Sequence, residues 1–507
     1  MIDLTLCLRL YGRYRRGVLA QEDAVAAQER TLLSLVRRAA ATRFGRDHDF
    51  AGIASVADFQ ARVPLRAYDA FWRQYWQASF PRLTDCSWPG TIPYFALSSG
   101  TTSGTTKYIP CSEAMVRANT RAGLDLLVHH LVARPRSKLL GGKSFLLGGS
   151  TDLQAEAPGI SSGDLSGIAA ARVPWWAKHL VFPPLEVALM TDWEAKIAAL
   201  ADLAPKADIR CLSGTPSWLL ILFERLAAQT GQSGAAGLFP RLELLVHGGV
   251  SFAPYRQRFE EWLEGTQAEL REVYAASEGF VALQDQAPAD GLRLVADNGL
   301  FFELVPVEEL GAPSPTRHWL ANAETGVNYA LAVSSCAGLW AYLLGDTVRL
   351  LSRAPPRIVI TGRTAYALSA FGEHLIGEEI DEAVTLAAAA IGAAVTDYAV
   401  GALYPGPDTV LGGHLYVVEL ASPVDEGARQ TFAETIDRHL LANNDDYRAH
   451  RASGFGMGPP RLLVVEAGGF ARWMKHRGQL GGQHKVPRVI NDPALFADLR
   501  RFLGDGA

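Results

Sequence analysis

The chain of 507 residues contains few cysteines, and none of them belongs to a CxxC pair. The five cysteines are Cys7, Cys86, Cys111, Cys211 and Cys336. Their odd number and wide spacing argue against a disulfide framework and against a structural zinc site. We therefore expect a protein of the reducing cytoplasm.

Long apolar runs and an excess of charge of one sign are also absent. No stretch of about 18 apolar residues exists, so no membrane span is predicted. Asp3 and Arg9 interrupt the apolar N-terminus and no small-residue cleavage site follows, which makes a poor signal peptide. The net charge is −5, and the basic cluster Arg13 to Arg16 is interpreted as a solvated helix face. Neither nucleic acid nor membrane is expected as a partner.

The N-terminal and middle parts of the chain alternate between helical and strand patterns. Residues 21–42 are typical of an amphipathic helix. Strands are predicted at 143–149, 209–212, 242–248 and 269–274, with helices at 193–204 and 216–229 between them. Thr215 can cap the second of these helices, and Pro216 suits its first position. Such alternation predicts an α/β fold with a parallel sheet.

The predicted secondary structure changes near residue 299, where strands follow one another without long helices up to 361. We predict a large N-terminal domain at 1–362, made of parallel α/β sheets plus a mostly antiparallel, β-barrel-like subdomain at about 295–362. A helix at 377–392, strands at 396–402 and 415–420, and a helix at 427–442 predict a small α+β C-terminal domain at 363–507. Segments 155–167 and 309–317 are rich in Gly, Pro and Ser, which predicts loops.

The stretch ALSSGTTSGTTKYIP at 96–110 combines hydroxyl side chains, two glycines and a lysine. Glycines allow successive N–H groups to form an anion nest, hydroxyls donate to phosphate oxygens, and a lysine supplies a point charge. The spacing is not that of a Walker A motif, which disfavours an ordinary P-loop NTPase. A polar surface turn is the alternative interpretation. The predicted phosphate-binding residues are Ser98, Ser99, Gly100, Thr101, Thr102, Ser103, Gly104 and Lys107.

Four further motifs follow in order: VYAASEGF at 273–280, YLLGD at 342–346, TGR at 361–363 and GQHKVPR at 482–488. As a set with SSGTTSGTTKYIP, they resemble the adenylate-forming superfamily of acyl and aryl ligases. More narrowly, they resemble the acyl-acid amido synthetases of the auxin-responsive Gretchen-Hagen-3 family. The resemblance extends from about residue 30 to 490 and includes the segment 44–71. The acidic residue that the wider superfamily carries after the GR pair is missing, since Ala365 stands there.

The resemblance implies roles for individual residues. Lys485 would swing in with the C-terminal lid domain and neutralise the α-phosphate of ATP, and Lys107 would hold the outer phosphates. Glu278 would bind Mg²⁺, a cation that prefers carboxylate and phosphate oxygens. A solvated loop lysine and an exposed strand-end glutamate are the structural alternatives.

The remaining predicted residues bind nucleotide or line a substrate pocket. Tyr274 offers a face for adenine and Asp346 accepts hydrogen bonds from ribose hydroxyls, or each is structural. Arg363 contacts the ribose or the α-phosphate, or pairs with a carboxylate. The other predicted nucleotide contacts are Gly248, Gly249, Val250, Ala275, Ala276 and Ser277. Thr215, Trp218 and Trp175 line an acyl pocket in one interpretation and belong to the core in another.

The implied activity is that of an ATP-dependent ligase. It would activate a carboxylic acid as acyl-AMP with release of pyrophosphate and then pass the acyl group to an amine, an amino acid being expected, with ATP and Mg²⁺ as cofactors. A coenzyme A ligase and a non-catalytic nucleotide-binding homologue are the alternatives. We expect small-molecule acid and amine partners and a monomer or weak dimer. The sequence does not identify the acid.

Overall fold

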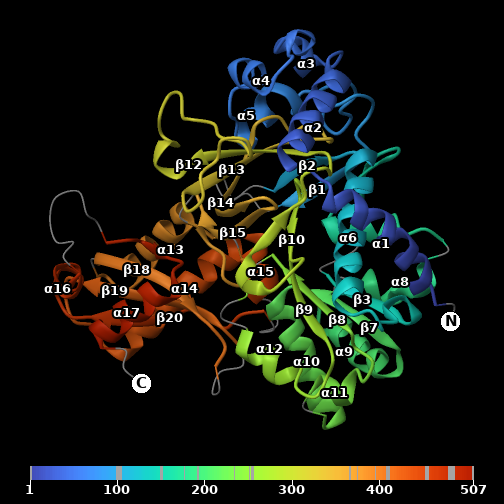
Figure 1. Cartoon of the computed structure of the whole chain (residues 1–507). Helices are drawn as coiled ribbons and strands as arrows, with labels where there is room; N and C mark the ends of the chain where they lie inside the picture. The colour runs from blue at the N-terminus through green and yellow to red at the C-terminus, as the bar shows by residue number, and fades with distance from the viewer. Residues whose placement is uncertain are drawn as a thin grey trace. The chain divides into compact units, whose positions relative to one another are not determined.

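The computed structural model divides the chain into two compact units (Figure 1). Unit 1 comprises residues 1–98, 107–249 and 257–364, and unit 2 comprises 99–106, 250–256 and 365–507. The structure describes residues 3–98, 106–148, 152–175, 177–190, 193–232, 234–249, 252, 256–364, 367–373, 375–393, 395–406, 411–451, 456–477 and 486–504.

Unit 1 is built on one large mixed sheet with the strand order β12-β13-β14-β15-β11-β10-β9-β8-β7-β3-β6. Its parallel half consists of β3 (Lys143–Leu147), β6 (Val181–Phe182), β7 (Ile209–Gly214), β8 (Leu244–Gly248) and β9 (Glu269–Ala276). Its antiparallel half consists of β10 (Gly279–Leu283), β11 (Leu292–Leu294), β12 (Leu300–Pro306), β13 (Asn328–Ser335), β14 (Tyr342–Arg353) and β15 (Pro356–Arg363).

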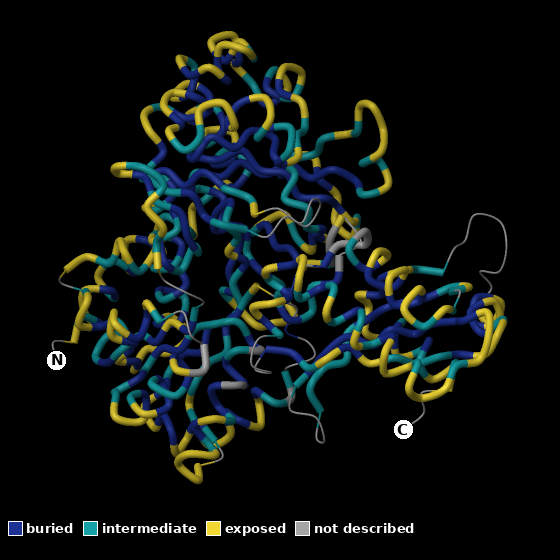
Figure 2. Tube along the Cα trace, turned by 180° about the vertical axis from the view of Figure 1, so that it is seen from behind, coloured by how far each residue is buried: buried dark blue, intermediate teal, exposed yellow. Residues whose placement is uncertain are grey.

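The predicted strands and their parallel or antiparallel character are confirmed. Short apolar runs bounded by turn residues become strands with buried residues on both faces, as in the parallel strand β8 and the antiparallel strand β12. In Figure 2 the buried residues follow these strands, while exposed residues lie mostly on loops and outer helix surfaces. The antiparallel strands join the parallel ones in the same sheet through β11, a long-range pairing that no local pattern indicated.

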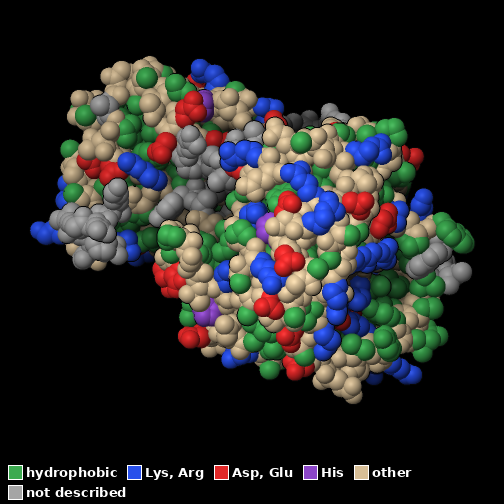
Figure 3. Space-filling view, turned by 90° about the horizontal axis from the view of Figure 1, so that it is seen from above, with side chains coloured by type: hydrophobic (Ala, Val, Ile, Leu, Met, Phe, Trp, Pro, Cys, Tyr) green, Lys and Arg blue, Asp and Glu red, His purple; other side chains and the backbone are tan. Residues whose placement is uncertain are grey.

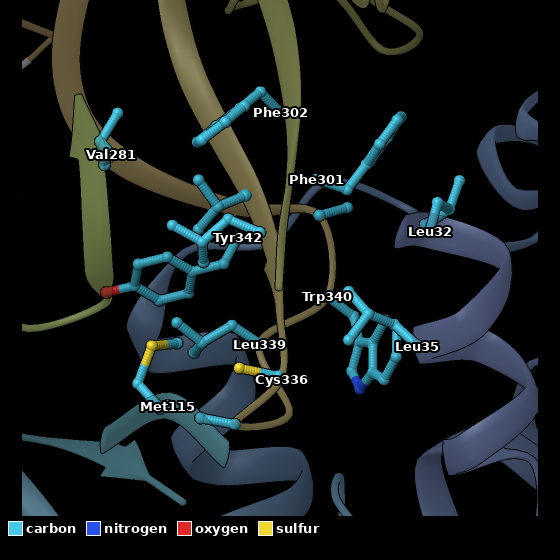
Figure 4. Close-up of a cluster of buried hydrophobic side chains, with 14 of the residues drawn as sticks. Leu32, Leu35, Met115, Val281, Phe301, Phe302, Cys336, Leu339, Trp340 and Tyr342 are labelled. Atoms are coloured by element: carbon cyan, nitrogen blue, oxygen red, sulfur yellow. The ribbon is translucent and has the colours of Figure 1, made fainter. Parts of the chain in front are cut away.

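Helices cover this sheet and form its hydrophobic core. They are α1 (Thr5–Ala20), α2 (Ala24–Ala39), α3 (Arg43–Asp47), α4 (Val56–Arg62), α5 (Tyr68–Phe71), α6 (Glu113–Ala133), α7 (Leu165–Ala171), α8 (Leu185–Ala188), α9 (Trp193–Leu203), α10 (Pro216–Thr230), α11 (Ala235–Leu238) and α12 (Arg256–Trp262). Helix α2 packs on β12, and α6 packs on β10. Figure 4 shows Leu32 and Leu35 of α2 beside Trp340, within the largest core cluster.

The cap predicted for α10 is only half confirmed. Pro216 occupies the first turn of the helix and Thr215 its N-cap position, but the Thr215 side chain makes no capping hydrogen bond. Its backbone carbonyl instead accepts the first helical bond, from Leu219 N. Pro216 lacks one of the four N–H groups that the start of a helix leaves without an intrahelical partner.

A second sheet of unit 1 has the order β2-β1-β5-β4. It contains β1 (Tyr94–Ser98), β2 (Lys107–Cys111), β4 (Gln154–Ala157) and β5 (Ile160–Gly163). The predicted loop at 155–167 is therefore wrong: it forms the β4–β5 hairpin and the start of α7. The pairing of β5 with β1 supplies hydrogen bonds that local composition did not reveal.

The interpretation of the Arg13–Arg16 cluster as a solvated helix face is wrong for Arg15. The Arg15 side chain is buried, and its guanidinium pairs with Asp125 at 2.8 Å and with Asp297 at 2.7 Å. Arg13 and Arg16 are exposed as predicted. One turn of α1 thus places a cation inside the protein because two carboxylates neutralise it there.

Unit 2 is a four-stranded sheet between two layers of helices. The sheet has the order β20-β19-β18-β21, with β18 (Val395–Leu403), β19 (Gly413–Leu420), β20 (Arg461–Val465) and β21 (Val489–Ile490). The helices are α13 (Gly377–Ala390), α14 (Glu426–Asn443), α15 (Asp445–Arg451), α16 (Gly469–His476) and α17 (Pro493–Leu503), and β16 (Ala367–Leu368) pairs with β17 (Leu375–Ile376).

Alternation along β18 and β19 explains the two layers. Tyr398 and Val400 join one core cluster with α13 and α14, while Ala399 between them joins another with α16 and α17. Successive strand residues point to opposite faces, so an apolar strand buries both. The helices and strands predicted between 377 and 442 are confirmed.

Two observations bear on membrane spans and on surface charge. None of the helices in the described part of the chain has the length and apolarity to cross a bilayer. On the face in Figure 3, acidic and basic side chains are interspersed.

Candidate active site

The hydroxyl-rich stretch connects the strands of a β-hairpin. Strands β1 and β2 are antiparallel, and Ser98 lies directly opposite Lys107 at the end where residues 99–106 connect the two strands. Ser99, Gly100, Thr101, Thr102, Ser103 and Gly104 lie outside the described residues. The two ends of the predicted phosphate loop are therefore fixed as neighbours by the strand register.

The parallel strands β7, β8 and β9 bring three other predicted segments to one edge. Their carboxyl ends are adjacent, which places Thr215, Gly249 and Ser277 at the same edge of the sheet. Open α/β sheets bind ligands at this edge. Gly248 is required by close packing, because a Cβ there would lie 2.3 Å from the Val273 carbonyl oxygen. Gly249 has φ +86°, which favours glycine, and Val250 lies outside the described residues.

Ser277 and Glu278 form the turn between β9 and β10, since Ala276 pairs with Gly279. The turn is unusual in that the Glu278 side chain is buried. Ser277 Oγ donates to the carbonyl oxygen of Leu97 at 3.4 Å, which links this turn to the end of β1. The two sheets of unit 1 thus meet where the phosphate loop begins.

Glu278 is a buried acid between charges of both signs. Burial raises its pKa, and the Asp346 carboxylate raises it further. The Glu278 backbone N–H, the Lys107 ammonium and the Tyr342 hydroxyl act in the opposite direction. Two carboxylates and a lysine from three separate predicted motifs therefore interact electrostatically.

Tyr274 lies against Asp346. The Tyr274 ring is buried, and its hydroxyl donates to Asp346 Oδ2 at 2.5 Å. Asp346 itself is half-buried and pairs across the β14–β15 ladder with Arg363, whose side chain is not described. Ala275 and Ala276 continue β9 beside Tyr274, with Ala275 exposed. The adenine and ribose roles of these residues stay predictions.

Sequence reasoning missed two tyrosines of this site. Tyr342 opens the YLLGD motif, and its hydroxyl acts to lower the pKa of Glu278. Tyr68 places its ring 5.7 Å from Lys107 Nζ, in cation–π distance, and its hydroxyl accepts a bond from Tyr108 N at 3.0 Å. The first was inside a motif already noted for its aspartate, whereas nothing near Tyr68 in the sequence indicated its contact with Lys107.

Three further positions were predicted to line the substrate pocket or to act at the α-phosphate. Trp218, on α10, is half-buried, and Trp175 has 84% of its side chain exposed. Lys485 lies outside the described residues. The roles of Thr215, Trp218 and Trp175 as pocket residues and of Lys485 as a catalytic residue stay predictions.

The acidic side chains fit a magnesium ion that is held jointly with a substrate. Among the described residues, no cluster of three or more His, Cys, Asp or Glu side chains is arranged to hold a metal alone. Mg²⁺ is commonly bound by one or two carboxylates together with substrate phosphates and water. Glu278, with Asp346 as its electrostatic neighbour, supplies this kind of donor set.

Comparison with known structures confirms the predicted fold. A GH3.15 acyl acid amido synthetase in complex with 2,4-DB is 18% identical, with a TM-score of 0.62 over 97% of this chain and 96% of that one. A 2-hydroxyisobutyryl-CoA ligase in complex with 2-HIB-AMP and CoA is also 18% identical, with a TM-score of 0.57 over 95% and 92%. The fold of this chain is thus similar to the folds of these two proteins over nearly their whole length.

Curated proteins with similar sequences match part of this chain, and they are named as amido synthetases. An indole-3-acetic acid-amido synthetase, GH3.8 of Oryza sativa subsp. indica, is 30% identical over 299 residues, 54% of this chain and 48% of the relative. The synthetase GH3.3 of Arabidopsis thaliana is 25% identical over 233 residues, 43% and 38%. The match to the curated relatives therefore spans about half of their length or less.

Family models match in three places, in the order expected for one family. The GH3 family N-terminal domain matches residues 14–166, the central domain 293–363 and the C-terminal domain 378–494. These matches contain Ser98, Lys107, Asp346 and Lys485, and together they cover about two thirds of the chain. The chain belongs to the GH3 family.

Proposed function

We propose that this protein is an ATP-dependent acid–amino acid ligase. It would join a carboxylic acid to ATP as acyl-AMP, release pyrophosphate, and then transfer the acyl group to an amine with release of AMP. The observation that carries the proposal is that the turn with the buried Glu278 is bonded, through Ser277, to Leu97 at the end of β1, where Ser98 lies opposite Lys107. Membership of the GH3 family and the named activities of the relatives support it.

In the first half-reaction, a substrate carboxylate attacks the α-phosphorus and the bond to the bridging oxygen breaks. Negative charge then develops on the pyrophosphate, so fixed cations and N–H groups at that position lower the barrier. Lys107, beside the Tyr68 ring, would bind the outer phosphates at the base of the loop. Glu278 would hold Mg²⁺, which when bound neutralises phosphate charge.

In the second half-reaction, an amine attacks the acyl carbon and AMP leaves. No covalent enzyme intermediate is needed, because ATP has already activated the acyl group. The bond between the acyl carbon and the phosphate oxygen breaks, AMP leaves as an anion, and the amine proton passes to solvent. Asp346 and Tyr274 would keep the nucleotide portion in place during both half-reactions.

The proposal is tested by incubating the protein with ATP, Mg²⁺ and a panel of acids of indole-acetate, jasmonate-like and benzoate-like type. Accumulation of AMP and pyrophosphate supports adenylation. Formation of ADP and phosphate, or no acid-dependent turnover with any acid, contradicts it. Mass spectrometry of the products with a set of amino acids then identifies the conjugate.

A coenzyme A ligase is the second candidate. The 2-hydroxyisobutyryl-CoA ligase matches this fold as well as one GH3.15 structure does, each with a TM-score of 0.57. The two acceptors are separated by measuring AMP release with amino acids alone and with coenzyme A alone. Release that depends on coenzyme A and is absent with every amino acid favours the second candidate.

Lys485→Ala tests the part of the proposal that depends on the C-terminal region. We expect ATP–pyrophosphate exchange to fall by roughly 100-fold or more while ATP binding changes little, because the lysine is assigned to the α-phosphate in the reacting state. Lys475→Ala, on α16, is the control and should exchange normally. Unchanged exchange in Lys485→Ala would mean that another cation acts at the α-phosphate.

The proposal also includes a cellular compartment and a division of the chain into domains. The five cysteines are free thiols, which supports the reducing cytoplasm. A boundary at 362/363, with a β-rich subdomain at 295–362, is retained as the proposed division, together with a monomer or weak dimer.

A further inference from the structure

Tyr68 connects two strands that carry predicted nucleotide contacts. It is the first residue of α5, and its side chain is buried. Close before it in the chain, Arg66 N donates to Ala341 O at 3.0 Å, directly before β14, and Leu343 N of β14 donates to Arg66 O at 2.9 Å. Strand β14 contains Asp346. The start of α5 is therefore fixed to the strand of one predicted nucleotide contact.

The Tyr68 side chain reaches β2 from this position and makes two contacts there. Its hydroxyl accepts a hydrogen bond from Tyr108 N at 3.0 Å, and Lys107 Nζ lies 5.7 Å from the centroid of its ring. In the sheet that the described residues form, β2 stands at the end of the strand order, beside β1. The hydroxyl therefore satisfies an N–H group of an edge strand, while the ring lies beside the ammonium of the preceding residue.

Aromatic packing holds the Tyr68 ring in this place. Trp72 stacks on it with ring centroids 5.8 Å apart and an interplanar angle of 19°, and the Trp76 centroid lies 6.0 Å away. Trp76 is fully buried and belongs to the same core cluster as Tyr68. Close-packed interiors leave such a ring little freedom to move. Tyr68 is thus a rigid partner, whereas the flexible four-carbon side chain of a lysine by itself allows many positions of the charge.

The ring attracts the Lys107 ammonium without cancelling its charge. A cation within about 6 Å of a ring centroid is attracted by the negative face of the ring. Because the ring carries no net charge, the ammonium keeps its full attraction for phosphate oxygens. Lys107 is the residue at which the predicted phosphate loop ends, opposite Ser98. The contact therefore restricts the position of a cation at the place where the outer phosphates are expected.

We propose that Tyr68 is a positioning residue that holds the Lys107 ammonium at the end of the predicted phosphate loop, where it meets the outer phosphates of ATP. This inference rests on the proposed function, in which Lys107 binds these phosphates. It assigns a role at the nucleotide site to α5, a helix that contains none of the residues predicted from the sequence to bind nucleotide.

The direct test compares two nucleotides that differ in the outer phosphates. Isothermal titration calorimetry in the presence of Mg²⁺ measures the Kd of the full-length protein for α,β-methylene-ATP and for AMP, which lacks the β- and γ-phosphates. We expect Tyr68→Leu to bind the analogue roughly 5- to 10-fold more weakly, the effect of losing one partly buried cation–π contact, and to bind AMP like the wild type. Unchanged affinity for the analogue, or an equal loss for both nucleotides, would overturn the inference.

Tyr75→Leu is the matched control. Tyr75 is 6% exposed, as Tyr68 is, and belongs to the same core cluster, but its ring centroid lies 5.2 Å from the guanidinium carbon of Arg43. The control variant removes an equally buried ring and should bind the analogue like the wild type. The same weakening in both variants would assign the effect to general loss of core packing and overturn the inference.

A series of aromatic residues at position 68 tests the face of the ring while keeping its shape. Tyr68→Phe loses the bond to Tyr108 N but keeps the ring, so the analogue should bind within about 2-fold of the wild type. Replacing this phenylalanine by its 4-fluoro, 3,5-difluoro and 3,4,5-trifluoro derivatives withdraws electrons from the ring face in steps and should weaken binding in steps. A purely structural ring would be insensitive to this change. Equal affinities across the series would refute the proposal, and this holds even if Tyr68→Leu folds poorly.

Lys107→Met separates failure of this inference from failure of the proposed function. If Lys107→Met binds α,β-methylene-ATP like the wild type, Lys107 does not hold the outer phosphates and both proposals fail at that residue. If Lys107→Met loses binding while Tyr68→Leu keeps it, only the role of Tyr68 is refuted. In the double variant, Tyr68→Leu should add nothing to the effect of Lys107→Met, because residues that act through one another are not additive. Additive effects would show that Tyr68 does not act through Lys107 and would refute the inference.

Discussion

Glu278 places a carboxylate where burial makes its charged form costly. Burial raises the pKa of Glu278, and Lys107 and Tyr342 offset this only in part. Such a residue is poorly suited to stabilise the fold by itself. It is well suited to bind a cation that arrives with the substrate, because the cation compensates the buried charge.

Glu278→Gln should accordingly separate activity from stability. Acid-dependent ATP–pyrophosphate exchange should fall by about 100-fold or more, while the free energy of unfolding should stay equal or rise, since a neutral amide replaces a buried charge. Exchange assays and urea unfolding measure the two quantities. A marked loss of stability with intact exchange would identify Glu278 as a structural residue.

Glu269 behaves in the opposite way. Burial acts to raise its pKa, but hydrogen bonds from His130 and Arg271 outweigh burial and lower it to about 2. Because the folded state holds the proton less tightly than the unfolded state, ionised Glu269 stabilises the fold above about pH 4.5, and this contribution is lost as the pH falls toward 2.

Glu269→Gln should therefore destabilise unit 1 at neutral pH by roughly 3 kcal/mol. The difference from the wild type should shrink steadily between about pH 4.5 and pH 2. Urea unfolding across this range measures it, with the exposed Glu264→Gln as control. A difference that is the same at every pH would mean that packing, not charge, explains the loss.

What the sequence revealed at residue scale depended on whether a local sequence pattern marked the residue. Glu278 and Asp346 follow strand patterns closely and were predicted from motifs. Tyr342 and Arg15 owe their roles to electrostatic interactions with residues far away in the sequence, Glu278 and Asp125 among them. Neither a helix pattern nor a strand pattern distinguishes an arginine that pairs in the interior from its exposed neighbours.

At the scale of elements, helix α1 is attached to unit 1 by a charge network as well as by apolar contacts. Arg15 Nε donates to Asp125 Oδ1 on α6 at 2.9 Å, and its terminal nitrogens pair with Asp297, between β11 and β12. Leu8 and Val128 form a small apolar cluster between α1 and α6. The helix is thereby connected both to its neighbour and to the main sheet.

Arg15→Ala should destabilise unit 1 by roughly 3–5 kcal/mol, because it leaves the buried Asp125 without its cation. Arg16→Ala is the matched control one residue away on the exposed side of α1, and it should change stability by no more than about 0.5 kcal/mol. Urea unfolding monitored by fluorescence compares them. Equal effects of the two substitutions would refute the assigned role of the network.

Elements were predictable where apolar residues repeated regularly. The strands β3, β7, β8 and β9 and the helices α10, α13 and α14 follow such repeats and were found within a few residues. The β4–β5 hairpin was missed because its residues are small and polar, with Gln154 and Ala155 exposed. Its pairing with β1 is long-range. The pairing of β11 with β15, which joins the parallel and antiparallel strands into one sheet, is also long-range.

At the scale of the whole molecule, the chain consists of two compact units with separate hydrophobic cores. Clusters around Trp340 and around Tyr416 lie in unit 1 and unit 2 respectively. Units of this kind generally do not unfold as one two-state system. The candidate site residues Lys107, Glu278 and Asp346 all belong to unit 1.

Scanning calorimetry should therefore resolve two transitions. Addition of α,β-methylene-ATP with Mg²⁺ should stabilise the transition of unit 1 by about 2.7 kcal/mol when the ligand is present at 100 times its Kd. The shift should be absent in Glu278→Gln. A single transition that the analogue moves equally in both proteins would contradict the assignment of the nucleotide to Glu278 and its neighbours.

The turn at Ser277 and Glu278 has a consequence for how this family can vary. Most hairpin tips project into solvent and accept extra residues, whereas this one ends against the core, with its acidic side chain enclosed. An additional residue between Ala276 and Gly279 would find no room there and would move the acid away from Lys107 and Asp346. We therefore expect related chains to vary in the residues of this turn but to keep its length.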